Sequence, residues 1–287
     1  MSLKSVPTTQ QDNTSHDEHE EDFDTSLIRK FIPNFLTLVG LLCGLTAIQM
    51  SFHDRMETAV LFILAAAILD ALDGAMARLL KANTEFGAQL DSLSDFLCFG
   101  VAPAFLLYMW GLEEAGRLGW IATLTFPAAA AIRLARYNAI DAKKKKTASR
   151  WRSKFFSGVP APAGAGLALF PIFVWFQAQS TFAEYNVGLP LIAIWVMAVA
   201  MLMVSRIPTW STKQLKLTPK FFVPMLAAGA LLLAVLIHAP WITLSVVSVI
   251  YIASLPFAFQ AFRKMEKAHD EKQADLSDLA FGAFDED

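Results

Sequence analysis

Residues 70–95 decide both the fold and the chemistry of this chain. They read DALDGAMARLLKANTEFGAQLDSLSD and place four aspartates, two glycines and one arginine in two segments that are otherwise apolar enough to lie in a membrane. An ionisable residue inside a membrane segment is energetically costly and therefore indicates a function. Four carboxylates of the same sign make that indication strong.

The four aspartates follow helical spacing on two successive segments. Asp70 and Asp73 are three residues apart and share one helix face, while Gly87, Asp91 and Asp95 form a row at intervals of four. Two acidic helix faces repel each other unless a cation lies between them. Carboxylate oxygens are ligands for hard divalent cations such as magnesium, so the spacing predicts a metal site between two helices.

The composition favours an integral membrane protein. Of the 287 residues, 55% are hydrophobic and 17% are charged. Soluble domains average about 45–50% hydrophobic and about 25% charged residues. The net charge of −2 excludes little, because the charges are segregated along the chain. Cys43 and Cys98 both lie in apolar segments, so we expect neither a disulfide framework nor a zinc site.

The apolar runs predict an all-α fold, a polytopic membrane helix bundle with about eight transmembrane helices, because about twenty apolar residues cross a bilayer. The expected spans are 33–52, 57–80, 87–111, 117–138, 157–176, 186–205, 221–238 and 241–262. They form one expected membrane domain, residues 27–265. The polar end segments 1–26 and 266–287 are expected to be disordered cytoplasmic tails.

The distribution of basic residues predicts the orientation. Cytoplasmic loops are enriched in Lys and Arg. With eight spans and both termini in the cytoplasm, only Arg55 and Arg117 face outward, and the other 22 of the 24 basic residues face inward. We therefore expect a bacterial-type cytoplasmic membrane protein whose aspartate cluster lies at the cytoplasmic face.

The spacing D-x2-D-G-x2-A-R-x8-G-x3-D-x3-D resembles the signature of the CDP-alcohol phosphotransferase family. All eight positions are matched, by Asp70, Asp73, Gly74, Ala77, Arg78, Gly87, Asp91 and Asp95. The resemblance implies an enzyme that moves a phosphatidyl-type group from a CDP-linked lipid to an alcohol and releases CMP.

The resemblance also implies roles for individual residues. Mg²⁺ or Mn²⁺ would be held by Asp70, Asp73, Asp91 and Asp95. Asp95 is also the expected catalytic base for the incoming hydroxyl. The CDP-lipid would be contacted by Asn34, Thr37, Gly74, Ala77, Arg78 and Gly87. Two of these assignments have alternatives: Arg78 also suits a membrane-interface anchor, and a helix start would use Asn34 and Thr37 in any case.

Further segments resemble the branch of this family that uses L-serine. They are IPNFLTLVGLLCGL (32–45), DFLCFGVAPAF (95–105), IRLARYN (132–138), FFSGVPAPA (155–163) and MVSRIPTWSTK (203–213). Eight spans suit this branch better than the six usual elsewhere in the family. The resemblance implies CDP-diacylglycerol and L-serine as substrates, a site among membrane lipid, a homodimer and no nucleic-acid partner.

Serine carries a carboxylate, so its site should offer a cation. Arg133 and Arg136 lie three residues apart on one expected helix, and a planar guanidinium matches a carboxylate with two hydrogen bonds. Lys154 is a weaker candidate. The alternative role for the arginines is positive-inside anchoring of the span.

Two other functions remain possible at this stage. One is a sibling transferase that uses glycerol phosphate, inositol phosphate or choline. The other is a cation transporter whose acidic residues line a path. The fixed spacing of Gly and Arg relative to the aspartates argues against the transporter, because an ion path needs no such spacing.

Overall fold

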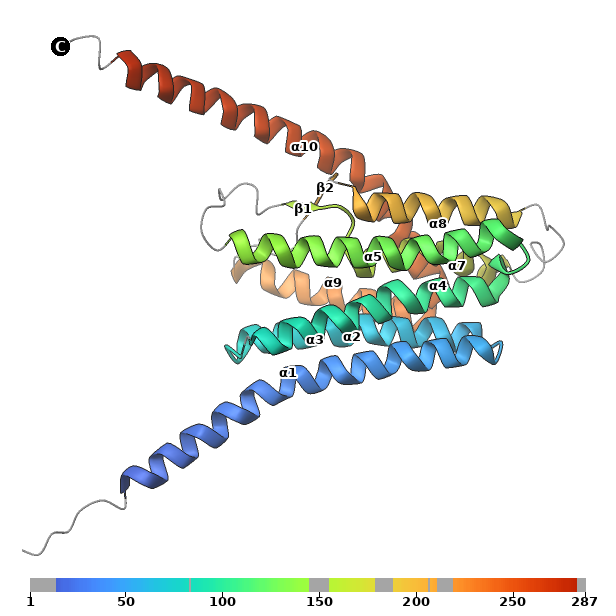
Figure 1. Ribbon diagram of the computed structural model, residues 1–287, viewed down its shortest axis with the longest axis horizontal. Coiled ribbons are helices and arrows are strands. Elements are labelled where there is room, and N and C mark those ends of the chain that lie inside the picture. Colours follow the sequence, from blue (N-terminus) through green and yellow to red (C-terminus); the bar gives the residue numbers. More distant parts are fainter. Residues whose placement is uncertain are drawn as a thin grey trace, which may run out of the picture.

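The chain forms a bundle of helices, which confirms the expected all-α membrane fold (Figure 1). The computed structural model describes residues 14–82, 84–144, 155–178, 188–205, 207–210 and 219–282. Within these residues a single short antiparallel ladder accompanies the helices, formed by strands β1 (Phe155–Ser157) and β2 (Pro208–Trp210).

The first half of the chain supplies four α-helices and two π-helical turns before the long helix α5. Their bounds are α1 Thr14–Phe52, α2 Met56–Leu79, α3 Glu85–Phe96, η1 Leu97–Val101, α4 Ala102–Leu107, η2 Tyr108–Leu112 and α5 Gly116–Lys144. The second half supplies α6 Ala161–Ala168, α7 Phe170–Ala178, α8 Gly188–Val204, α9 Pro219–His238 and α10 Pro240–Gly282. The third expected span is therefore a composite of α3, η1, α4 and η2.

Six described stretches are long and apolar enough to cross a membrane. They are Phe31–Phe52, Met56–Leu79, Glu85–Leu112, Gly116–Ala139, Ala161–Ala178 and Pro240–Glu266. Two shorter apolar helices, Gly188–Val204 and Gly229–His238, coincide with the remaining expected spans. The number of eight crossings stays a prediction. The domain limits at 27 and 265 also stay predictions, and each lies within a continuous helix, α1 or α10.

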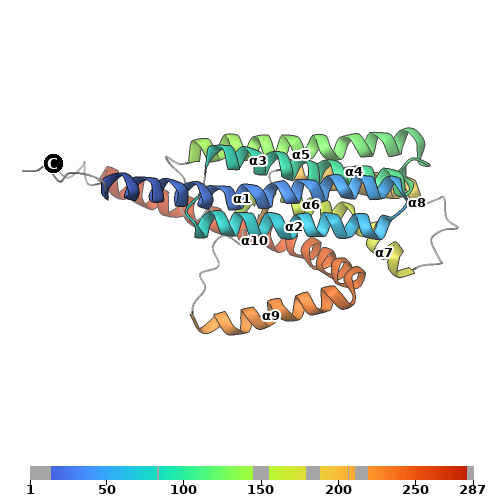
Figure 2. The ribbon, with the colours of Figure 1, turned by 90° about the horizontal axis from the view of Figure 1, so that it is seen from below.

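The helices run side by side along one common direction (Figures 1 and 2). Helix α1 packs along α2 and α3, and α5 packs along α8, while α10 lies against α7 and β2. In Figure 2, α9 stands to one side of the bundle, and α10 is its main neighbour. The outer ends of α1 and α10 project from the same end of the bundle (Figure 2).

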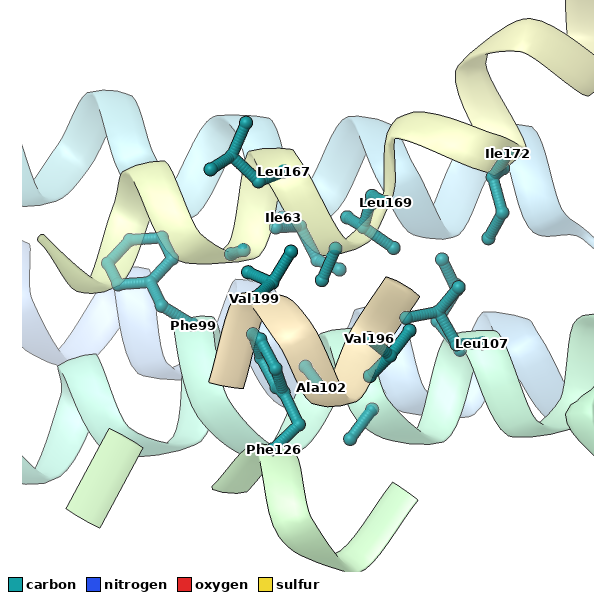
Figure 3. Packing of buried hydrophobic residues seen from close by; sticks show 14 of the residues in the cluster. Ile63, Phe99, Ala102, Leu107, Phe126, Leu167, Leu169, Ile172, Val196 and Val199 are labelled. Carbon is teal, nitrogen blue, oxygen red and sulfur yellow. The ribbon is translucent and has the colours of Figure 1, made fainter. Parts of the chain in front are cut away.

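The core is a continuous apolar cluster between the helices (Figure 3). Its fully buried side chains include Phe99, Leu107, Phe126, Leu167 and Val196. The outer surface is also apolar, because most helices carry large exposed hydrophobic side chains. This pattern suits a lipid solvent, because lipid tails are as apolar as the core itself.

Small residues let α1 approach the third span closely. A side chain at Gly44 would lie 2.6 Å from the Cys98 sulfur, and the Cys98 thiol donates a hydrogen bond to the Gly40 carbonyl over 3.3 Å. One turn earlier, the Ser94 hydroxyl donates to the Thr37 carbonyl over 3.3 Å. Both cysteines are free, as expected. These contacts fix α1 beside the helix that carries Asp91 and Asp95.

Candidate active site

A tight reversal brings the two acidic helix faces together. Helix α2 ends in a Schellman motif, in which the Lys81 N–H donates to the Arg78 carbonyl and the Ala82 N–H to the Ala77 carbonyl. Lys81 itself takes a left-handed conformation with φ of 51°. Thr84 then caps α3, because its hydroxyl oxygen accepts a hydrogen bond from the Gly87 N–H over 3.0 Å.

Three of the four aspartates form one acidic cluster. Carboxylate oxygens of Asp70, Asp91 and Asp95 all lie within 4.8 Å of one another. Three carboxylates at such distances fit a hard divalent cation, for which oxygen ligands are preferred. The donor set therefore agrees with the metal site that the spacing predicts.

Asp73 lies apart from this cluster. Its side chain is only 5% exposed, and one carboxylate oxygen accepts a hydrogen bond from the Thr37 hydroxyl over 2.6 Å. The same hydroxyl lies 3.0 Å from the Pro33 carbonyl oxygen. The structure thus connects the fourth predicted metal ligand, Asp73, to α1, and it pairs this ligand with Thr37, which was expected to contact the CDP-lipid.

A first polar cavity of about 210 Å³ lies between α1, α2 and the start of α3. Its walls contain all six residues predicted to contact the CDP-lipid, namely Asn34, Thr37, Gly74, Ala77, Arg78 and Gly87. Asp73 and Asp91 also line it. Residues from three helices, separated by more than fifty positions in the sequence, therefore share one cavity.

The two signature glycines are small for different reasons. A side chain at Gly87 would lie 2.7 Å from the Asn34 side-chain oxygen, so Gly87 is needed for the contact between α1 and α3. At Gly74 the nearest atom to an added carbon is an Arg78 nitrogen, 3.8 Å away. Packing alone does not demand a glycine at position 74. Its missing side chain leaves room in the cavity.

A second polar cavity of about 300 Å³ adjoins the first. The two share Asp73, Gly74, Arg78 and Asp91, and the second continues to Asp70, Asp95, Arg133, Tyr137 and Pro162. The acidic cluster therefore lies where the cavities meet. One side of it faces the predicted nucleotide-lipid residues, and the other faces an arginine.

The two candidate serine-binding arginines have different surroundings. Arg133 is 9% exposed and lines the second cavity, and its Nε has no hydrogen-bond partner within the described part of the chain. Arg136 donates to the carbonyl oxygens of Val204 over 2.6 Å and Ser205 over 3.1 Å, at the end of α8. Arg136 lines neither polar cavity. Lys154 lies outside the described residues.

Some residues of the site were not predicted from the sequence. Tyr137 and Pro162 line the second cavity, and Thr84 lines the first. Tyr137 follows Arg133 by one helical turn, so the helix period offered a signal for it. Thr84 precedes Gly87 by three residues, which is the spacing of a helix N-cap. For Pro162, only the quoted segment FFSGVPAPA gave any indication.

These features define an integral membrane protein with a half-buried acidic site at the junction of two polar cavities. Residues 30–205 match the family described as CDP-alcohol phosphatidyltransferase, and residues 220–256 match CDP-alcohol phosphatidyltransferase 2. The chain therefore belongs to the CDP-alcohol phosphotransferase family, and it is an enzyme of phosphatidyl transfer.

Several relatives carry the name CDP-diacylglycerol--serine O-phosphatidyltransferase. The protein of Mycobacterium leprae (strain TN) is 33% identical over 258 residues, which cover 85% of this chain and 83% of that protein. That of Helicobacter pylori (strain 26695) is 32% identical over 194 residues, covering 68% and 78%. That of Bacillus subtilis (strain 168) is 36% identical over 139 residues, covering 48% and 73%.

Proposed function

We propose that this protein transfers the phosphatidyl group from CDP-diacylglycerol to L-serine, giving phosphatidylserine and CMP. The observation that carries the proposal is the acidic cluster of Asp70, Asp91 and Asp95 where two polar cavities meet. The names of the relatives, which align over most of the chain, support serine as the acceptor.

The acidic cluster is the proposed site for Mg²⁺ or Mn²⁺. Asp70, Asp91 and Asp95 would hold the ion, and Asp73, which lies outside this cluster, would line the site from the wall that the two cavities share. A divalent cation held there would neutralise the pyrophosphate and polarise its phosphoryl oxygens.

The first cavity is the proposed site of the cytidine diphosphate group. Gly74 and Ala77 leave space along α2, and Arg78 reaches both cavities, where a guanidinium can pair with a phosphate. Thr37 holds the Asp73 carboxylate on the cavity wall through its 2.6 Å hydrogen bond. Asn34 and Gly87 set the spacing between α1 and α3.

The second cavity is the proposed site of serine. The Arg133 guanidinium would bind the serine carboxylate, because it lines this cavity and its Nε has no partner among the described residues. Asp95 would accept the proton of the serine hydroxyl. The hydroxyl oxygen then bonds to the lipid-side phosphorus, the bond from that phosphorus to the CMP oxygen breaks, and CMP leaves with the bonding electron pair.

We propose a different role for Arg136. Because its guanidinium donates hydrogen bonds to the carbonyl oxygens of Val204, the last residue of α8, and of Ser205, which follows it, Arg136 holds α5 and α8 together near the serine cavity. It would therefore position the helix that carries Arg133 instead of contacting the substrate.

We further propose that the site faces the cytoplasm. The turn between α2 and α3 lies at the end of the bundle from which the outer ends of α1 and α10 project (Figure 2). This agrees with two cytoplasmic termini and with the positive-inside distribution of Lys and Arg. Assembly as a homodimer also remains a proposal, which rests on the family resemblance.

Acceptor substitution tests the proposed function. The purified protein is given CDP-diacylglycerol with Mg²⁺ or Mn²⁺, and CMP release is followed with serine, glycerol phosphate, inositol phosphate or choline. Serine-dependent CMP release, abolished in Asp91→Asn, is the expected result. Release with another acceptor would identify a sibling transferase, and metal uptake without any CMP release would favour a transporter.

A further inference from the structure

A third cavity, of about 200 Å³, lies between α2, α6 and α10 and is almost entirely apolar. Its walls include Ile63, Ala67, Phe99, Gly166, Leu244 and Val247. Ile63 and Phe99 are seen in Figure 3, together with Leu167 and Leu169 of the same lining. The composition of these walls selects an apolar occupant.

This apolar cavity adjoins the active site. Pro162, at the start of α6, lines both the apolar cavity and the second polar cavity. Helix α2 also passes from one cavity to the other, because Asp70 lines the polar cavity and Ala67 and Ile63 line the apolar one. At 1.5 Å per residue, Ile63 lies about 10 Å along the helix from Asp70. The cavity therefore extends from the acidic cluster towards the middle of the span.

Helix packing does not require the space at Gly166. A side chain at Gly166 would meet no atom within 4 Å, whereas one at Gly164, two residues earlier, would lie 2.6 Å from the Met203 sulfur. Gly164 thus serves the contact between α6 and α8, and Gly166 keeps the cavity open. An unfilled apolar space forfeits dispersion contacts along its walls, so an occupant stabilises the cavity.

We propose that this cavity holds one acyl chain of the nucleotide-linked lipid donor, and that α10 forms the wall that sets which chains fit. The proposal rests on the proposed function and deepens it. The donor joins an apolar chain to a pyrophosphate, and the cavities provide an apolar site beside an acidic one. Leu244 and Val247 bring α10 to this cavity.

Filling the cavity tests the proposal. In Gly166→Leu the new side chain enters the space that the glycine leaves open. The protein in detergent is mixed with equal amounts of CDP-dioctanoylglycerol and CDP-dioleoylglycerol without serine, and the bound lipid is analysed by mass spectrometry. Each buried methylene is worth roughly fourfold in affinity, and the dioctanoyl donor buries fewer. We therefore expect the ratio of bound lipids to shift towards dioctanoyl by roughly fourfold for each methylene that the leucine displaces.

The matched control is Gly229→Leu on α9. A side chain added at Gly229 also meets no atom within 4 Å, but Gly229 does not line this cavity. The control should keep the ratio of the unmodified protein. Leu244→Ala enlarges the cavity from the opposite wall and should shift the ratio towards dioleoyl. This second variant provides the test if Gly166→Leu does not fold.

An unchanged lipid ratio in the folded cavity variants would overturn the proposal and would mean that ordinary membrane lipid fills the space. Because the binding measurement contains no acceptor, it is independent of serine transfer. A protein that transfers nothing to serine but shows the shifted ratio would refute the proposed acceptor and leave the acyl site standing.

Discussion

Removing the Arg133 guanidinium should weaken serine binding selectively. Arg133 is almost fully buried, lines the second polar cavity and has an unpaired Nε among the described residues. A hydrogen bond to a charged group contributes about 1.5–3 kcal/mol. A loss of about 2 kcal/mol corresponds to roughly a thirtyfold change in affinity. We therefore expect Arg133→Ala to raise the serine KM about thirtyfold.

The assay is CMP release, with serine varied at saturating CDP-diacylglycerol and the lipid varied at saturating serine. The KM for the lipid should stay nearly constant, because Arg133 does not line the first cavity. Arg133→Lys keeps the charge but loses the planar fork, so it should restore part of the serine affinity. Ethanolamine is serine without its carboxylate, so its KM should be nearly the same for Arg133→Ala and for the unmodified enzyme.

Arg136→Ala provides the structural comparison. It removes two hydrogen bonds to carbonyl groups at the end of α8, so it should lower the melting temperature of the protein. The serine KM should rise far less in this variant than in Arg133→Ala. A normal serine KM in folded Arg133→Ala, or a serine defect in Arg136→Ala as large as that of Arg133→Ala, would refute the reasoning from the two environments.

Three other outcomes are expected. Gly74→Ala should fold normally but reduce the affinity for the CDP-lipid. Gly87→Ala should lower the melting temperature, because its methyl group would meet the Asn34 oxygen. Equal melting temperatures of the two variants would contradict this distinction. Asp95→Asn should still bind CDP-diacylglycerol in an equilibrium assay but lose turnover, and near-normal turnover would assign the base to another group. Reporter fusions should read as external after residues 54, 115, 180 and 239, and cytoplasmic readings at two or more of these sites would exclude the eight-span topology.

The pairing of the acidic helices could be predicted because it depends on local periodicity. Asp70 on one helix, and Asp91 with Asp95 on the next, are separated only by a short turn, so their faces meet once the helices are antiparallel. Asp73 could not be separated from them in this way. Its distinct environment comes from Thr37, which lies 36 residues earlier on α1 and reaches it only through tertiary packing.

The different roles of the two arginines could not be predicted from the sequence either. Arg133 and Arg136 are of one residue type, three positions apart on one helix, and the sequence gives them equal standing. Their partners differ because the neighbouring elements differ. The carbonyl groups at the end of α8 lie beside Arg136, whereas the aspartate cavity lies beside Arg133. The apolar cavity could not be predicted either, because its walls combine residues of α2 with residues of α10, which are far apart in the sequence.

The π-helical turn η1 sets the rotation of α3 relative to α4. A π-turn contains one residue more than an α-turn. If residues 97–101 wound as regular α-helix at the same length, the extra residue would add one helical step and rotate Asp91 and Asp95 by about 100° relative to α4. Either the carboxylates would turn away from Asp70, or α4 would expose its buried side chains. The register of the active site is therefore encoded in five residues that line neither polar cavity.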